Sequence, residues 1–232
     1  VQAMTKQRIR VWDLPTRLFH WLLVALVLAA VITGQLGGAL IPWHGRIGLG
    51  LLGLLVFRLL WGFMGSTHAR FCDFFPGPGR LLAYLRGQWR GVGHNPLGAL
   101  SVLALLGILS LQAVTGLFAN DDIAFQGPLT VLVDGEISEW LTRIHRLNFN
   151  LLLGLVGLHV GAILFYTLVK KDNLVKPMIN GLKEVEDPLA QPARGGGLGP
   201  FLIALILSSA VVAAASGAFI APPPPPPDPP AW

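Results

Sequence analysis

Charged residues are scarce in this chain. Asp, Glu, Lys and Arg make up 12% of its 232 residues, whereas apolar residues make up 53%. Soluble globular domains carry about 25% charged residues, so this composition predicts an integral membrane protein in contact mainly with lipid. The net charge of +5 would also suit nucleic acid. The basic residues lie at the ends of apolar segments rather than in one patch, however, so we expect them to set membrane orientation and predict no nucleic-acid binding.

Cysteine is almost absent as well, because Cys72 is the only one in the sequence. A single cysteine excludes an internal disulfide, an iron–sulfur cluster held by cysteines, and covalent haem attachment through a C-x-x-C-H motif. Any metal or redox cofactor must therefore be held by other side chains.

Long apolar runs, by contrast, are plentiful. Spanning the hydrocarbon core of a bilayer takes roughly 20 apolar residues. Five segments qualify: 18–36, 44–64, 97–118, 145–169 and 200–220. The first follows a basic stretch but has no clear small-residue cleavage site, so we expect a retained helix rather than a signal peptide. The sequence thus predicts an all-α membrane protein, a four-helix bundle with an added fifth transmembrane helix.

Lysine and arginine are unevenly divided between the two sides of such a bundle. They gather before the first helix and in the connections 65–96 and 170–199, whereas the other side has only Arg46, Arg143 and Arg146, near helix ends. Positive residues concentrate on the cytoplasmic side of membrane proteins. We therefore predict a cytoplasmic N-terminus and, with five helices, a C-terminus on the outer side.

The C-terminal part differs in composition from the rest. We divide the chain into a four-helix domain (1–185), a flexible glycine-containing linker (186–199), a fifth helix (200–220) and an extended Pro-rich tail (221–232). In the fifth helix Ser209, Ala213 and Gly217 recur every four residues, a pattern that favours helix–helix contact. A simple membrane anchor would explain this helix equally well.

Histidines are the most informative polar residues of the apolar segments. His145 and His159 are 14 residues apart in one segment, which corresponds to about 21 Å along a helix and places both within about 40° of one face. Because the first helix runs outward and the second runs inward, His20 is level with His159, and His44 is level with His145. The sequence therefore predicts two histidine pairs at two depths.

Two facing imidazoles suit a haem better than a zinc ion. Structural zinc requires a full tetrahedral set of ligands, and each depth offers only two histidines. A haem supplies its own equatorial ligands and needs two axial ones. We therefore predict two haems, held by His20 with His159 and by His44 with His145, and glycines such as Gly34 and Gly154 to make room for them.

Two arginines and two residues of the third helix have alternative interpretations. Arg58 and Arg17 lie near the inner pair and could neutralise a haem propionate, or they could extend to lipid headgroups. We favour the propionate for Arg58, which is deeper, and leave both alternatives open for Arg17. Gln112 and Thr115 could contact a quinone, but hydrogen bonding between helices is the interpretation we favour.

Several short motifs together resemble a known family. RLFHW in the first helix, WHGRIGLG and RLLWG in the second, and H-x13-H followed by KDN in the fourth are similar to the bacterial cytochrome b561 family, which includes the b-type cytochrome subunit of nickel–iron hydrogenases. The resemblance covers residues 10–182. It implies a four-helix bundle in the inner membrane with two haem b groups on the four histidines. It also implies electron exchange between the quinone pool and a redox partner outside the cytoplasmic membrane.

Three functions are therefore in competition. The first is a transmembrane electron carrier between quinone and a periplasmic partner such as a c-type cytochrome, with quinol or quinone oxidoreductase activity left open. The second is the membrane-anchor cytochrome subunit of a hydrogenase or dehydrogenase, in which the helix 200–220 contacts a partner helix. The third is a non-redox transporter, which would explain buried polar residues but not two matched pairs of histidines.

Overall fold

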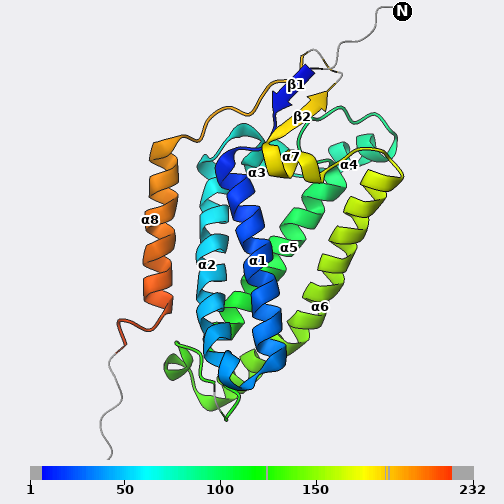
Figure 1. The fold of residues 1–232 in the computed structure, drawn as a ribbon. Coiled ribbons are helices and arrows are strands. Elements are labelled where there is room, and N and C mark those ends of the chain that lie inside the picture. Colours follow the sequence, from blue (N-terminus) through cyan, green and yellow to red (C-terminus); the bar gives the residue numbers. More distant parts are fainter. Residues whose placement is uncertain (1–6, 124, 186, 188, 221–232) are drawn as a thin grey trace, which may run out of the picture.

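A computed structural model describes residues 7–123, 125–185, 187 and 189–220. Five of its helices are long and apolar enough to cross a membrane. They are α1 (Leu14–Leu36), α2 (Ile41–Met64, preceded by the short 3-10 helix Gly38–Leu40), α5 (Pro96–Leu117), α6 (Gly135–Leu168) and α8 (Leu198–Ala215). Helices α1, α2, α5 and α6 form the bundle, and α8 lies beside α2 (Figure 1). The prediction of an all-α membrane protein is confirmed.

Local sequence signals set where these helices begin. The side chain of Asp13 accepts a hydrogen bond from the backbone of Thr16 at the start of α1, and Asn95 caps α5 in the same way. Such caps satisfy backbone N–H groups that have no partner inside the helix. Asp134 caps α6 through the backbone N–H of Ile137. The fourth helix therefore begins ten residues before the predicted 145, because its first turns are polar and carry no hydropathy signal.

Short elements cover one end of the bundle, which we call the strand end. Strand β1 (Gln7–Arg10) pairs antiparallel with β2 (Leu182–Val185), and α3 (Phe71–Phe74), α4 (Pro78–Leu85) and α7 (Val175–Asn180) lie at the same end (Figure 1), as does the 3-10 turn Thr67–Ala69. The opposite end, which we call the loop end, carries the connection 118–134 with the 3-10 turn Thr130–Leu132. The sequence analysis missed the small sheet, which joins residues more than 170 positions apart.

The core of the bundle lies between its two ends. Phe19 of α1, Leu55 of α2 and Leu152 of α6 are buried together with Leu106 and Leu109 of α5. Leu152 is seven residues from both His145 and His159. An apolar layer therefore separates the two depths at which the histidines lie.

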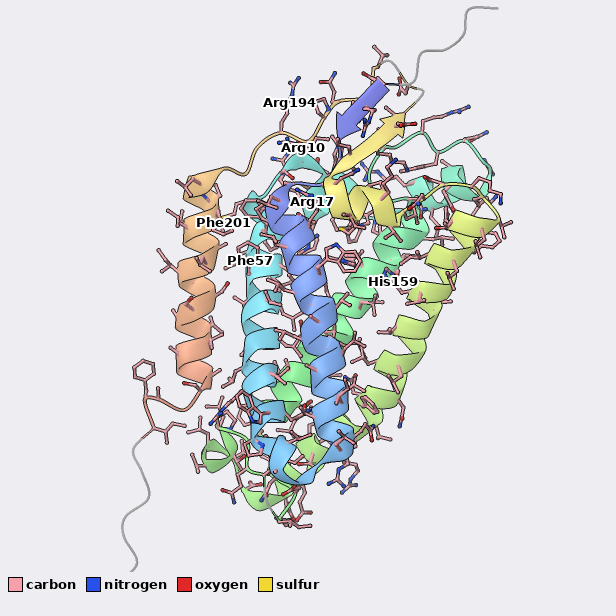
Figure 2. All side chains as sticks on the ribbon, viewed as in Figure 1. Arg10, Arg17, Phe57, His159, Arg194 and Phe201 are labelled. Atoms are coloured by element: carbon pink, nitrogen blue, oxygen red, sulfur yellow. The ribbon has the colours of Figure 1, made fainter. Side chains whose placement is uncertain are left out.

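Helix α8 packs on α2 through small residues and an aromatic ring. Ala204, Ser208 and Ala215 are buried, whereas Ser209 is exposed. Phe201 meets Phe57 of α2 with ring centroids 5.6 Å apart (Figure 2). Of the predicted stripe, Ala213 and Gly217 are half-buried and Ser209 is exposed, so contact of a partner helix with this stripe stays a prediction. Small residues allow the close approach of α8 to α2, and Phe201 packs against the rings of Phe57 and Trp61.

The linker and tail predictions concern the ends of α8. Within 186–199, the backbone N–H of Ala193 donates to the carbonyl of Arg10, and that of Thr67 donates to the carbonyl of Arg194. These bonds attach the chain before α8 to the strand end. The Pro-rich tail at 221–232 lies outside the described residues.

Candidate functional site

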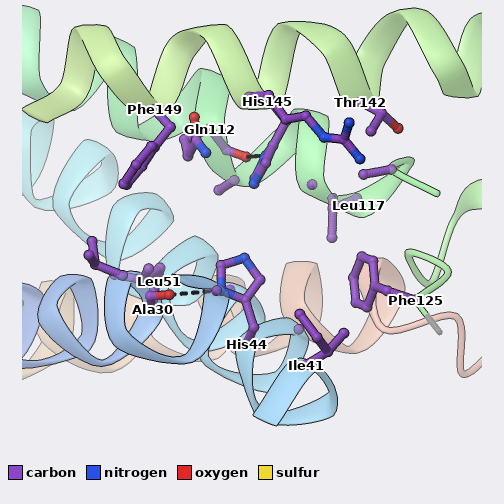
Figure 3. A pocket seen from close by; sticks show the side chains of 18 of the residues that line it. Ala30, Ile41, His44, Leu51, Gln112, Leu117, Phe125, Thr142, His145 and Phe149 are labelled. Atoms are coloured by element: carbon purple, nitrogen blue, oxygen red, sulfur yellow. Dashed lines mark hydrogen bonds between the residues drawn. The ribbon is translucent and has the colours of Figure 1, made fainter. Parts of the chain in front are cut away.

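His44 of α2 and His145 of α6 face each other near the loop end. Their ring centroids are 6.2 Å apart and their planes are nearly perpendicular, at 85° (Figure 3). Two imidazoles on opposite sides of one metal ion, with metal–nitrogen bonds of about 2.0 Å, have ring centres roughly 6 Å apart. The spacing of this pair therefore suits two axial ligands of one iron.

Backbone carbonyls set which nitrogen of each ring is free. The Nδ1 atom of His44 donates to the carbonyl of Ala30 at 2.9 Å, and Nδ1 of His145 donates to that of Gln112 at 3.0 Å (Figure 3). Thr115 places its hydroxyl 3.2 Å from the same atom of His145. A proton held on Nδ1 leaves the lone pair of Nε2 available, and such bonds are typical of metal-binding histidines.

A cavity of about 430 Å³ lies between the two rings. Apolar side chains such as Leu109, Leu117 and Phe149 form most of its lining, together with Gly48 and other small residues. Pockets that bind cofactors commonly measure about 300–1,000 Å³ and have such apolar walls. The residues of this site therefore fit a haem in size and polarity as well as in ligand spacing.

Two glycines lie directly against the rings of this pair. A Cβ atom on Gly34 would stand 3.0 Å from His44, and one on Gly116 would stand 3.1 Å from His145. Ordinary contacts begin at 3.4 Å. The sequence analysis expected Gly34 to make room for a haem. The structure adds that Gly34 makes room for the histidine itself.

The second pair consists of His20, near the start of α1, and His159 of α6. Figure 2 shows His159 in the half of the bundle toward the strand end. The two side chains are close enough for their charges to interact. Ser101 of α5 places its hydroxyl 3.4 Å from Nδ1 of His159. Nδ1 of His20 is buried and has no hydrogen-bond partner among the described residues. The structure thus places His44 beside His145 and brings His20 within electrostatic range of His159.

The two predicted arginines differ in environment. Arg58 is only 3% exposed, its guanidinium lies 5.1 Å from the ring centre of Phe71, and its Nη1 has no partner among the described residues. An arginine this deeply buried cannot reach lipid headgroups; its charge interacts with Asp13, but its Nη1 donor is left unsatisfied. Arg17 is half-buried and donates from Nη1 to the carbonyl of Ile179 in α7, so that contact occupies part of its guanidinium.

The polar residues of α5 bind other helices. The amide of Asn148 donates to Oε1 of Gln112 at 2.6 Å, and the hydroxyl of Thr115 lies against His145. Helix–helix hydrogen bonding, the interpretation favoured from sequence, is therefore confirmed. That these two residues also orient His145 was not predicted from the sequence. The available signal was their spacing of three residues, which places both on one face of α5.

Comparison with known proteins places these observations in a family. A family model described as prokaryotic cytochrome b561 matches residues 11–181, and α8 lies beyond the match. A probable Ni/Fe-hydrogenase B-type cytochrome subunit of Rhizobium leguminosarum bv. viciae is 22% identical over 222 residues, which cover 80% of this chain and 93% of that protein. The corresponding hydrogenase 1 subunit of Escherichia coli K12 is 22% identical, with coverage of 75% and 89%. No solved structure matches the chain.

Proposed function

Because the chain belongs to the prokaryotic cytochrome b561 family, we propose that it carries two haem b groups and conducts electrons through the membrane for a nickel–iron hydrogenase. The family and the relatives make it a b-type cytochrome and a membrane electron-transfer component. The observation that supports the haem sites most strongly is the pair of Nδ1 hydrogen bonds that leaves Nε2 of His44 and of His145 free beside one cavity. Membership of this family removes the transporter hypothesis.

We assign His44 and His145 to an outer haem and His20 and His159 to an inner haem. Each haem supplies an iron that accepts and releases one electron when bound. The chain supplies the rest: the carbonyls of Ala30 and Gln112 hold the outer rings in one tautomer and orientation. The buried apolar layer around Leu152 excludes water between the two depths.

Arg58 compensates negative charge at the inner haem. Its unpartnered Nη1 is buried at the end of the bundle where the inner pair lies. A buried guanidinium is stabilised by a carboxylate that can accept from it. A haem propionate provides such a carboxylate, and Arg17 could contribute its Nε, which is also buried without a partner among the described residues.

Orientation and partners complete the proposal. The strand end holds most of the lysines and arginines, so we place it in the cytoplasm and the loop end in the periplasm of the bacterial inner membrane. The names of the relatives support a hydrogenase as the electron donor. A membrane quinone is the lipid-soluble carrier that could take electrons from an iron enclosed by apolar helices.

A c-type cytochrome at the loop end is a second candidate partner. Asp122, Glu136 and Glu139 are exposed there. Asp122 lies in the connection before α6, and the two glutamates lie in the first turns of α6, which begins at Gly135. Asp121 accepts the backbone N–H groups of Ile123 and Phe125 and so shapes the loop. The three exposed carboxylates would attract a basic protein surface.

Haem stoichiometry in purified protein tests the cofactor assignment. We expect two haems by the pyridine haemochrome assay, loss of the outer one in His145→Ala, and loss of the inner one in His159→Ala. His68→Ala is the matched control, because His68 lies in the connection after α2, outside both pairs, and should leave both haems in place. One haem in the unmodified protein, or two in either ligand variant, would show that the assignment is wrong.

A further inference from the structure

His94 lies in the connection between α4 and α5 and is enclosed by aromatic rings. Its ring centroid lies 4.6 Å from that of Trp12 and 4.7 Å from that of Phe74. It immediately precedes Asn95, which caps α5, so its backbone position is fixed by the start of that helix. The sequence analysis assigned it no role. The enclosure of a polar side chain by aromatic rings at the strand end requires a physical explanation.

Burial leaves part of this histidine without a hydrogen bond. Nδ1 of His94 is inaccessible to solvent and has no partner among the described residues. Burial lowers the pKa of His94, and the nearby side chains of Arg58, His68 and His159 lower it further, so the ring is neutral at pH 7. A neutral imidazole still offers one N–H donor. An unsatisfied buried donor is destabilising.

A second unsatisfied donor lies close by. Nη1 of Arg58 is buried without a partner among the described residues, and the two side chains interact electrostatically. They also share one aromatic wall: Arg58 lies over Phe71, and the ring of Phe71 is 5.7 Å from that of Phe74, which contacts His94. In the tautomer of His94 that carries its proton on Nδ1, two unsatisfied donors lie beside one aromatic wall, an arrangement that suits a single acceptor bound by both.

Asp13 interacts with Arg58 electrostatically but does not accept a hydrogen bond from its Nη1. Oδ1 of Asp13 accepts from the backbone of Thr16, and its Oδ2 accepts from the indole of Trp61 at 3.0 Å. The missing group is an anion or strong acceptor, and His159 lies within electrostatic range of His94. A carboxylate on a cofactor held by His159 satisfies this requirement.

We propose that His94 donates a hydrogen bond to a propionate of the inner haem and, with Arg58, positions that haem. This inference rests on the proposed inner haem and adds a residue to its site. His94 would be a positioning residue, because it acts on the iron through the propionate. Its N–H dipole offsets part of the propionate's negative charge. Since oxidised iron carries one more positive charge than reduced iron, removing the dipole favours oxidised iron and lowers the inner midpoint potential.

Three substitutions separate the donor from the packing of the ring. His94→Phe keeps an aromatic ring between Trp12 and Phe74 but removes the donor, and His94→Leu removes both. His94→Gln keeps an N–H donor. His68→Gln is the matched control, since His68 is also in the strand-end connections but lies on the solvent side, with Nε2 3.3 Å from the carbonyl of Gln191. The measurement is a spectroelectrochemical titration of both haems in purified protein.

We expect a lower inner midpoint potential in the Phe and Leu variants, a value near that of the unmodified protein in the Gln variant, and an unchanged outer potential in all of them. An unchanged inner potential in Phe or Leu, or an equal shift of both haems, would overturn the role of His94. If the Phe variant does not fold, the comparison of Leu with Gln decides in the same way. A single haem in the unmodified protein would overturn this inference together with the two-haem proposal, whereas two haems with an unmoved potential would overturn this inference alone.

Discussion

The packing of Gly34 against the ring of His44 provides a specific test of the outer site. Gly34→Ala places a methyl group 3.0 Å from both Cε1 and Nδ1 of His44, where contacts normally begin at 3.4 Å. The ring must move by a few tenths of an ångström. Ala30, which accepts the Nδ1 hydrogen bond, lies one turn before Gly34 on the same helix. The added methyl therefore pushes the ring away from the carbonyl that orients it.

The magnitude follows from the loss of that orientation. Disturbing the group that orients a metal-binding histidine typically costs about 10–100-fold in affinity, which is about 1.4–2.8 kcal/mol. The same substitution favours the helix by about 1 kcal/mol, because alanine is a better helix former than glycine. We therefore expect weaker binding of the outer haem without a less stable bundle.

The assay is haem titration of the purified variant, with thermal unfolding of the haem-free protein measured in parallel. Outer-haem affinity should fall about 10–100-fold while the inner haem is unaffected. Gly107→Ala in α5 is the control, because a Cβ there meets nothing within 4 Å. Unchanged outer-haem affinity in Gly34→Ala, or an equal loss in Gly107→Ala, would refute the argument that this glycine exists to seat His44.

Three further predictions concern partners and orientation. Hydrogen gas should reduce the haems in membranes that contain the cognate hydrogenase. If a basic c-type cytochrome is the partner instead, the rate of electron transfer to it should fall as salt shortens the Debye length from about 10 Å at 0.1 M to about 3 Å at 1 M. Neutralising Asp122, Glu136 and Glu139 should remove that salt dependence. A salt-independent rate would exclude docking at the loop end. Reporter fusions after Asn173 and after Trp232 should lie on opposite sides of the membrane, in the cytoplasm and periplasm respectively, and the same side for both would show that α8 does not span.

Much of the site could be predicted because it depends on quantities that are local to the chain. Five spans follow from the length of apolar runs. The relation of His145 to His159 follows from the rise and rotation of one continuous helix, and the opposite directions of successive helices match them with His20 and His44. The late predicted start of α6, and the residues through which α8 packs on α2, have a common cause. Apolar content measures affinity for lipid and contains no information on caps or on which neighbour a helix meets.

The sequence by itself therefore determined the number of candidate membrane-spanning helices, and it predicted the two depths at which the histidines pair. The reason is that covalent geometry and hydrophobicity act along the chain. Only the tertiary structure decided which groups act on those histidines. The carbonyls of Ala30 and Gln112 reach His44 and His145 from other helices, and Arg58 meets His94 only where β1, α3 and the start of α5 converge. Such contacts join residues far apart in sequence, and their distances are fixed by packing of the whole bundle rather than by any local pattern.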